Sequence, residues 1–197
     1  MATQDRPAGW NALARVFHWA MAAIILGLVG VGLYMVEVLG DDFETLAQRY
    51  RLTQLHKSWG VVVFALAALR ILWRAVTPSP ELPREMNGLE RAAAHGAHVA
   101  LYGLMFALPL TGWLMASASP LNDPGAYPMQ VKNMVFGLFE LPDPYPKGDK
   151  ALSETLAAIH FWCAMALLAV LAGHVAAALK HHYVNRDRVL MRMIRGR

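Results

Sequence analysis

The chain has 197 residues, of which 56% are hydrophobic and only 16% are charged, whereas an average soluble domain is roughly 45–50% apolar and about 25% charged. This composition excludes a disordered chain, a coiled coil and a nucleic-acid-binding domain, although the net charge is +4. The single cysteine, Cys163, excludes a disulfide framework, a CxxC zinc site and a c-type haem attachment, and what remains is a small integral membrane protein that carries 8 histidines.

Four segments are long and apolar enough to cross a bilayer, which takes about 20 residues of helix. Segments 16–36, 99–118 and 156–179 contain no charged residue, although Pro109 interrupts the second of them. The segment 55–76 is weaker, because it contains two arginines and a lysine. We therefore predict an all-α integral membrane four-helix bundle. It forms one membrane domain over residues 1–197, with helices at about 13–38, 55–76, 92–118 and 154–180.

An even number of spans places both termini on one side of the membrane. The segments on that side have a net charge of +7, and those on the other side have a net charge of −3. The positive-inside rule therefore predicts that both termini are cytoplasmic. Residues 119–153 then form a long, proline-rich periplasmic loop, in which the apolar run 134–139 is able to rest on the outer leaflet.

Four histidines fall at two depths within the predicted helices. His56 and His160 lie near the periplasmic ends of their helices, and His18 and His174 lie near the cytoplasmic ends. His160 and His174 share one helix at a spacing of 14 residues, which puts them within roughly 40° of the same face and about 21 Å apart along the axis. Two imidazoles at each of two depths are the arrangement typical of two b-type haems, each with two axial histidine ligands. For any one of these histidines, the alternative is a hydrogen-bonded residue of the bundle.

The other four histidines lie at the cytoplasmic rim: His95, His98, His181 and His182. Because imidazole can hydrogen-bond a quinone carbonyl and exchange a proton near neutral pH, we predict a quinone site at this rim. His98, one turn deeper than His95, and His181 are its candidates. A solvated helix end and a surface metal site at His95 and His98 remain the alternatives.

Charged residues and glycines near the histidines complete the candidate site. Arg15, Arg70 and Lys57 are candidates for pairing with haem propionates, and snorkelling of their side chains towards the membrane surface is the alternative. Gly60 and Gly173 lie close in sequence to His56 and His174, where they leave room for a macrocycle, although glycines also serve ordinary helix packing.

Five motifs of the chain, spread from Arg15 to Met193, resemble those of the bacterial cytochrome b561 family. They are Arg15-Val16-Phe17-His18-Trp19, Leu55-His56-Lys57-Ser58-Trp59-Gly60, Arg70-Ile71-Leu72-Trp73-Arg74, Ile159-His160-Phe161-Trp162, and Leu179-Lys180-His181-His182-Tyr183 followed by Asp187 and Arg192-Met193. The resemblance implies a four-helix bacterial inner-membrane protein with two b haems, which exchanges electrons with ubiquinone. It also implies that His18 pairs with His174 and that His56 pairs with His160 as haem ligands.

The sequence therefore predicts a di-haem b-type cytochrome that transfers electrons across the inner membrane between a periplasmic donor and ubiquinone as substrate. The family includes a superoxide oxidase, so the resemblance permits superoxide:ubiquinone oxidoreductase activity, whereas the charge of −3 on the periplasmic side does not favour an anionic substrate.

A second branch of the family has a small secreted lipocalin-like partner, for which the long loop is a docking surface. The expected partners are membrane lipid, ubiquinone and either superoxide or a small periplasmic protein, and no nucleic acid.

Two other functions stay open at this point. One is an electron-transfer subunit that serves a dehydrogenase, a hydrogenase or a secreted partner protein. The other is a bundle without redox activity that binds a metal or transports a solute.

Overall fold

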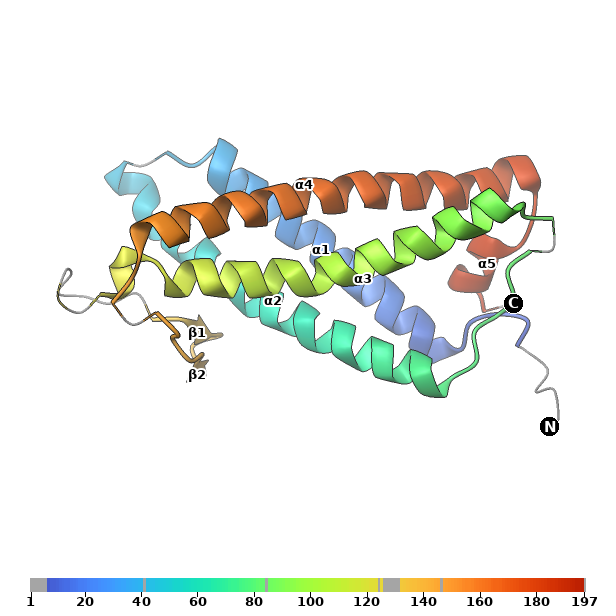
Figure 1. Ribbon diagram of the computed structural model, residues 1–197, viewed down its shortest axis with the longest axis horizontal. Helices are drawn as coiled ribbons and strands as arrows, with labels where there is room; N and C mark the ends of the chain where they lie inside the picture. Colours follow the sequence, from blue (N-terminus) through green and yellow to red (C-terminus); the bar gives the residue numbers. More distant parts are fainter. Residues whose placement is uncertain are drawn as a thin grey trace.

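The computed structural model describes residues 7–40, 42–83, 85–123, 125, 132–145 and 147–196. Four long helices run alongside one another through the length of the molecule (Figure 1): α1 (Ala12–Glu37), α2 (Phe43–Val76), α3 (Gly88–Ser117) and α4 (Lys150–Lys180). The shorter elements are a 3-10 turn (Pro120–Asn122), the antiparallel hairpin β1 (Met134–Val135) and β2 (Phe139–Glu140), a π-helical turn (His181–Asn185) and α5 (Val189–Ile194).

Each long helix begins with a side-chain cap from an asparagine or an aspartate. The side chains of Asn11, Asp42, Asn87 and Asp149 accept hydrogen bonds from backbone N–H groups of the first turn at 2.8–3.0 Å. Such caps satisfy donors that would otherwise lack a partner at a helix start. They set where the helices begin, while the apolar stretches set where they cross the membrane.

The start of α2 differs from the prediction, because the helix begins at Phe43 rather than near residue 55. The first three turns are too polar to belong to a membrane span, but Asp42 caps them and Arg49 ties them to the end of α1. The Nη2 atom of Arg49 donates to the carbonyls of Met35 at 3.2 Å and Leu39 at 2.7 Å. The helix therefore continues beyond its apolar part as a polar extension.

The outer surface of the bundle is apolar, as expected for helices in contact with lipid. All four long helices are long and apolar enough to cross a membrane. Large apolar side chains on them point outward, with Leu72 64% exposed and Val99 73% exposed. Exposed apolar area of this extent indicates a membrane environment. The prediction of four apolar spanning helices in a helical bundle is thus confirmed.

The bundle has two distinct ends. The first and last described residues lie at the same end (Figure 1), which we call the terminal end, and the β1–β2 hairpin lies towards the opposite end, which we call the loop end. The polar extension of α2 and the N-terminus of α4 also belong to the loop end.

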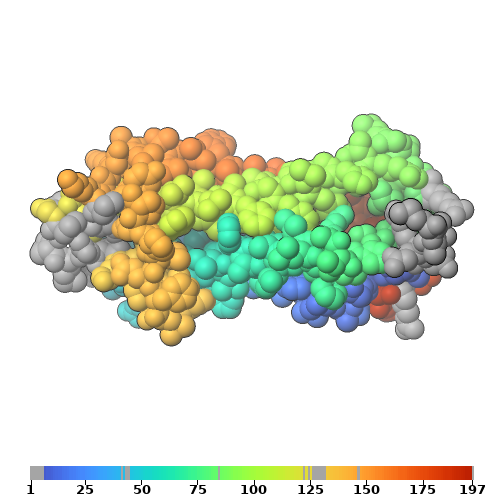
Figure 2. Space-filling model, turned by 60° about the horizontal axis from the view of Figure 1, so that its bottom comes forward, coloured from blue at the N-terminus to red at the C-terminus, as the bar shows by residue number. Residues whose placement is uncertain are grey.

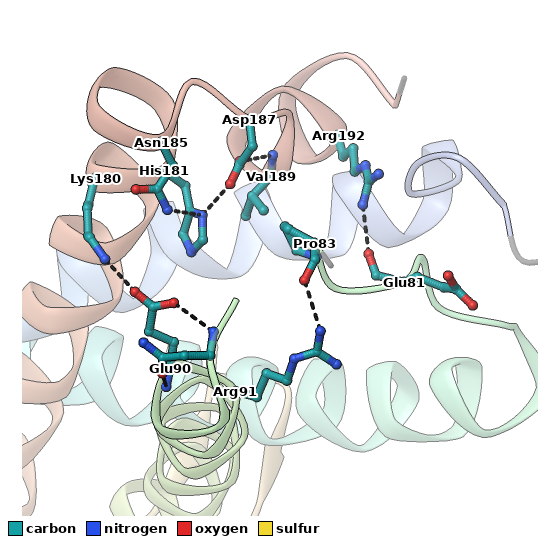
Figure 3. A network of polar contacts seen from close by, with 11 residues as sticks. Glu81, Pro83, Glu90, Arg91, Lys180, His181, Asn185, Asp187, Val189 and Arg192 are labelled. Carbon is teal, nitrogen blue, oxygen red and sulfur yellow. Dashed lines mark hydrogen bonds and ion pairs between the residues drawn. The ribbon is translucent and has the colours of Figure 1, made fainter. Parts of the chain in front are cut away.

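At the terminal end, the chain turns back after α4 and docks α5 on the bundle (Figure 3). Arg186 adopts the left-handed conformation, with φ of 54°, directly after the π-helical turn. Asp187 then accepts a 2.5 Å hydrogen bond from Nδ1 of His181 and a 2.9 Å bond from the backbone N–H of Val189, the first residue of α5. One carboxylate therefore joins the end of α4 to the start of α5.

Long-range hydrogen bonds hold α5 in place. Arg15 Nη1 donates to the carbonyl of Ile194 at 3.0 Å, and Trp19 Nε1 donates to that of Met193 at 3.2 Å. Arg192 donates to the carbonyl of Glu81 in the α2–α3 connection at 2.7 Å (Figure 3). The chain end thereby contacts the start of α1, and we call residues 181–194 with these bonds the C-terminal clasp.

Substitution Asp187→Ala should loosen the C-terminal clasp, because it removes both bonds of the carboxylate. Loss of two partly buried hydrogen bonds corresponds to about 1–2 kcal/mol, so α5 should open roughly tenfold more often. Hydrogen exchange in detergent should show faster exchange of the amides of residues 189–194. The control is Glu154→Gln, which removes an exposed ion pair with Lys150 and should leave this exchange unchanged. Unchanged exchange in Asp187→Ala would contradict the role of the carboxylate.

Candidate cofactor-binding site

Four histidines form two pairs at two levels of the bundle. His56 of α2 faces His160 of α4 towards the loop end, with ring centroids 6.2 Å apart and ring planes at 68°. His18 of α1 faces His174 of α4 towards the terminal end, with centroids also 6.2 Å apart and planes at 59°. The structure thus brings together the residues that the sequence placed in two layers, and α4 contributes one histidine to each pair.

The spacing within each pair fits two axial ligands of one metal ion. A metal–imidazole nitrogen bond is about 2 Å long and the ring centre lies roughly 1 Å behind the nitrogen, so two imidazoles on opposite sides of one ion have centres roughly 6 Å apart. Both pairs have this separation. Edge-to-face ring contacts cover the same range of centroid distances, so the spacing is compatible with a metal ion between the rings.

Thr111 of α3 orients the ring of His160. Its hydroxyl donates to the carbonyl of Ala107 at 2.8 Å and lies 3.0 Å from Nδ1 of His160. Since the hydroxyl hydrogen is already engaged, the second contact is a bond from the Nδ1–H of His160 to the threonine oxygen. This tautomer leaves Nε2 unprotonated, as a metal ligand must be.

Glycines allow neighbouring helices to approach the rings of the loop-end pair. A Cβ atom on Gly32 would lie 3.4 Å from Cε1 of His56, and one on Gly112 would lie 3.2 Å from Cε1 of His160. Nδ1 of His56 is buried towards the backbone of Leu28 in α1, without a well-formed hydrogen bond. By contrast, a Cβ on Gly60 or Gly173 would meet no atom within 4 Å, which is compatible with space for a macrocycle.

Arg70 of α2 lies beside the terminal-end pair. Its Nη1 and Nη2 atoms both lie 3.4 Å from Nδ1 of His18, and its Nε donates to the hydroxyl of Tyr102 at 3.0 Å. Because a guanidinium only donates, this contact favours the His18 tautomer with its hydrogen on Nε2. Metal ligation through Nε2 of His18 would require the other tautomer, in which Nδ1 carries the hydrogen and no longer accepts from Arg70.

His98 of α3 belongs to the same level of the bundle. Its ring centroid lies 5.6 Å from that of His174. It also lines a cavity of about 680 Å³ at the terminal end, between α2, α3 and their connection. Arg74, His95 and Tyr102 line the cavity as well. The cavity has the size and mixed lining of a site for a small molecule, and it lies directly beside the terminal-end histidine pair.

The other predicted residues lie elsewhere. His181, which is 8% exposed, is held by Asp187 in the C-terminal clasp and does not line the cavity. Arg15 binds the carbonyl of Ile194, and its Nε is buried with no hydrogen-bond partner among the described residues. Among the residues that the structure describes, no group of three or more His, Cys, Asp or Glu side chains is arranged to hold a metal ion, so His95 and His98 do not belong to such a group there.

A spacing of 14 residues recurs on all four long helices, and the sequence analysis identified it only on α4. On each helix, one residue lies at the loop-end level and one at the terminal-end level. The pairs are His18 and Gly32, His56 and Arg70, His98 and Gly112, and His160 and His174. Members of different helices meet at each level, as the contacts of Gly32 with His56 and of Arg70 with His18 show. This repeated spacing could have identified Gly32 and Gly112, whereas no local signal marks Thr111.

Comparisons with known proteins agree with this geometry. The family model described as prokaryotic cytochrome b561 matches residues 9–196. Cytochrome b561 homolog 2 of Escherichia coli K12 is 30% identical over 196 residues, which cover 98% of this chain and 95% of the relative. The "probable superoxide oxidase CybB" of Yersinia pestis is 28% identical over an alignment that covers 94% of this chain and 95% of that relative. Cytochrome b561 homolog 1 of Escherichia coli K12 is 25% identical over an alignment that covers 90% of this chain and 92% of that relative.

A family match over almost the whole chain, four apolar helices and paired histidines in their interior lead to one conclusion. The chain belongs to the prokaryotic cytochrome b561 family of multi-pass membrane electron-transfer proteins, which bind b-type haem.

Proposed function

We propose that this protein is a di-haem b-type cytochrome, which transfers electrons across the bacterial inner membrane between a periplasmic-side donor and ubiquinone. The proposal depends on one observation, which is that two histidine pairs lie at different levels of the bundle. In each pair the ring centroids are 6.2 Å apart. A b-type haem supplies a one-electron carrier where it is bound. The protein supplies its ligands, its apolar surroundings and the distance between the two sites.

His56 and His160 are the proposed axial ligands at the loop-end level, and His18 and His174 are those at the terminal-end level. Thr111 supports this assignment, because it holds His160 in the tautomer that binds metal. Arg70 is the proposed partner of a haem propionate, since among the described residues its two Nη atoms meet the ring nitrogen of His18 at a long 3.4 Å and no carboxylate. Arg15 is a second candidate, because its buried Nε atom has no hydrogen-bond partner in the part of the chain that the structure describes.

The distribution of charge supports a cytoplasmic position for the terminal end. The terminal-end segments have a net charge of +7, and the loop-end segments have a net charge of −3. Positively charged loops remain in the cytoplasm. On this basis the pair His56 and His160 lies on the periplasmic side, and the pair His18 and His174 lies on the cytoplasmic side.

The cavity beside His98 is the proposed quinone site. Its volume of about 680 Å³ is sufficient for a quinone ring with part of its tail, and its lining combines apolar residues with His95, His98 and Tyr102. His98 connects the cavity to the terminal-end site, because its ring lies 5.6 Å from that of His174. His181 contributes indirectly by fixing the C-terminal clasp, rather than as a contact of the quinone.

The electron donor divides the proposal into two versions. Similarity to a relative named as a probable superoxide oxidase favours superoxide, which would make the protein a superoxide:ubiquinone oxidoreductase. The other version is an electron-transfer subunit that accepts electrons from a dehydrogenase, a hydrogenase or a secreted partner. The two versions share the same histidine pairs and the same quinone cavity.

The variants His56→Ala and His160→Ala should each lose one haem, and it should be the same haem. The reason is that both histidines are ligands at one level, while His18 and His174 remain intact. Pyridine haemochrome analysis should give about half of the haem content of the wild type, and both variants should show the same remaining reduced spectrum. The double variant should lose no more haem than either single one. Loss of different haems would disprove the pairing, and His182→Ala, at the bundle end, serves as the control.

The variant His98→Leu should keep both haems but slow their reduction by a short-chain ubiquinol. Removal of one hydrogen bond to the quinone corresponds to about 1–3 kcal/mol, or a roughly 5- to 150-fold effect. Stopped-flow spectroscopy of the haem bands measures this rate. His182→Leu is the matched control, because it removes a rim histidine that does not line the cavity. An unchanged rate in His98→Leu would place the quinone elsewhere.

Superoxide should reduce the haems of the purified protein if superoxide is the donor. Xanthine oxidase provides the superoxide, and added superoxide dismutase should abolish the reduction. Reduction of a soluble ubiquinone by the protein should likewise require superoxide and be abolished by superoxide dismutase. If superoxide leaves the haems oxidised while a ubiquinol reduces them, the protein is instead the electron-transfer subunit of another donor.

A further inference from the structure

The turn of the β1–β2 hairpin presents a small apolar surface at its tip. Phe136 is 42% exposed, Leu138 is 80% exposed and Phe139 is 53% exposed, whereas Val135 is buried. Phe136 and Gly137 adopt positive φ values of 49° and 71°, which produce the tight turn. A turn between two strands is usually polar, so three exposed apolar side chains at this place need a partner.

The hairpin is fixed to α2 by hydrogen bonds. The backbone N–H of Phe136 donates to Oγ of Ser58 at 2.8 Å, and Ser58 is only 1% exposed. Lys57 Nζ donates to Oδ1 of Asn133 at 3.0 Å, and Gln54 donates to the carbonyl of Lys132 at 3.2 Å. These contacts span about one turn of α2 and determine the level at which the tip lies.

That level is the boundary of the apolar part of α2. The ring of Phe136 lies edge-on to the ring of Trp59, with centroids 5.5 Å apart and planes at 88°. Trp59 is the first residue of the apolar stretch 59–69 and is 42% exposed, and tryptophan is enriched at the membrane interface. The hairpin lies along the side of the bundle rather than beyond its end (Figure 1), and it protrudes beside α2 in Figure 2.

The polar residues of the hairpin lie at its base. Lys132 forms a 3.0 Å ion pair with Glu140, and Lys57 lies beside it through Asn133. An apolar tip with lysines at the base is the amphipathic pattern of a segment seated in a membrane interface. The long apolar stems of the lysines allow their ammonium groups to remain among lipid headgroups.

We propose that the tip of the hairpin, formed by Phe136, Leu138 and Phe139, is inserted into the lipid leaflet at the loop end. Its partner is the upper part of the phospholipid acyl chains, with Lys57 and Lys132 at the level of the headgroups. Because the same hairpin binds Gln54, Lys57 and Ser58, the lipid would hold it against the turn of α2 that carries His56. This inference rests on the membrane fold and is independent of the proposed donor, acceptor and haem ligands.

The variant Leu138→Cys, made in a Cys163→Ala background, tests the proposal after labelling with a nitroxide. The protein is reconstituted in phosphatidylcholine nanodiscs, where both faces are open to solvent. Power-saturation electron paramagnetic resonance then compares collisions with oxygen, which concentrates in lipid, and with a water-soluble nickel chelate. We expect the oxygen-to-nickel ratio at position 138 to be several-fold higher than at Lys147→Cys, an exposed position of the same loop.

The variant Phe139→Cys, labelled in the same way, provides a second measurement, so that the result does not depend on a local effect of one substitution. Unchanged elution volume and helical circular dichroism verify that each variant is folded. High oxygen-to-nickel ratios at both positions support insertion of the tip. Nickel accessibility at both positions equal to that at position 147 would overturn the proposal and leave this surface free for a protein partner.

Discussion

The structure depends on one constraint, which is that every long helix offers the bundle interior one residue at each of two levels. The spacing of 14 residues corresponds to nearly four helical turns, so the two residues share a face. At the loop-end level the four residues are Gly32, His56, Gly112 and His160, and at the terminal-end level they are His18, Arg70, His98 and His174. The first level thus combines two imidazoles with two glycines that make room for them, and the second combines three imidazoles with one guanidinium.

The two levels therefore differ in charge and in access. At the terminal-end level, Arg70 is a partly buried cation whose described contacts are the neutral hydroxyl of Tyr102 and a ring nitrogen of His18. A cation in apolar surroundings requires a negative partner or strong donors and acceptors around it. This level also opens into the cavity at His98, while the glycines close the rings of the loop-end level against α1 and α3. The terminal-end level is consequently the one suited to exchange with a molecule from the membrane.

The sequence was sufficient for the features that depend on spacing along one helix, and insufficient for those that depend on contacts between distant segments. The four spans and the layering of His18, His56, His160 and His174 follow from apolar length and the helical repeat. The early start of α2 was missed, because a polar extension held by Asp42 and Arg49 has no apolar pattern. The hairpin and the C-terminal clasp depend on bonds between residues far apart in the chain, and His181 belongs to that clasp rather than to the cavity.

The contribution of α4 to both histidine pairs has a consequence for biosynthesis. A ribosome makes the chain from its N-terminus, so His18 and His56 enter the membrane long before their partners on the last spanning helix. Neither pair exists until α4 is inserted, and the pair of His18 with His174 closes a longer loop than the pair of His56 with His160, at a somewhat higher cost in chain entropy. On the proposed ligand assignment, cofactor loading would therefore be a late step of assembly, because one helix completes both histidine pairs. A chain that is truncated before α4 retains three spans and neither pair.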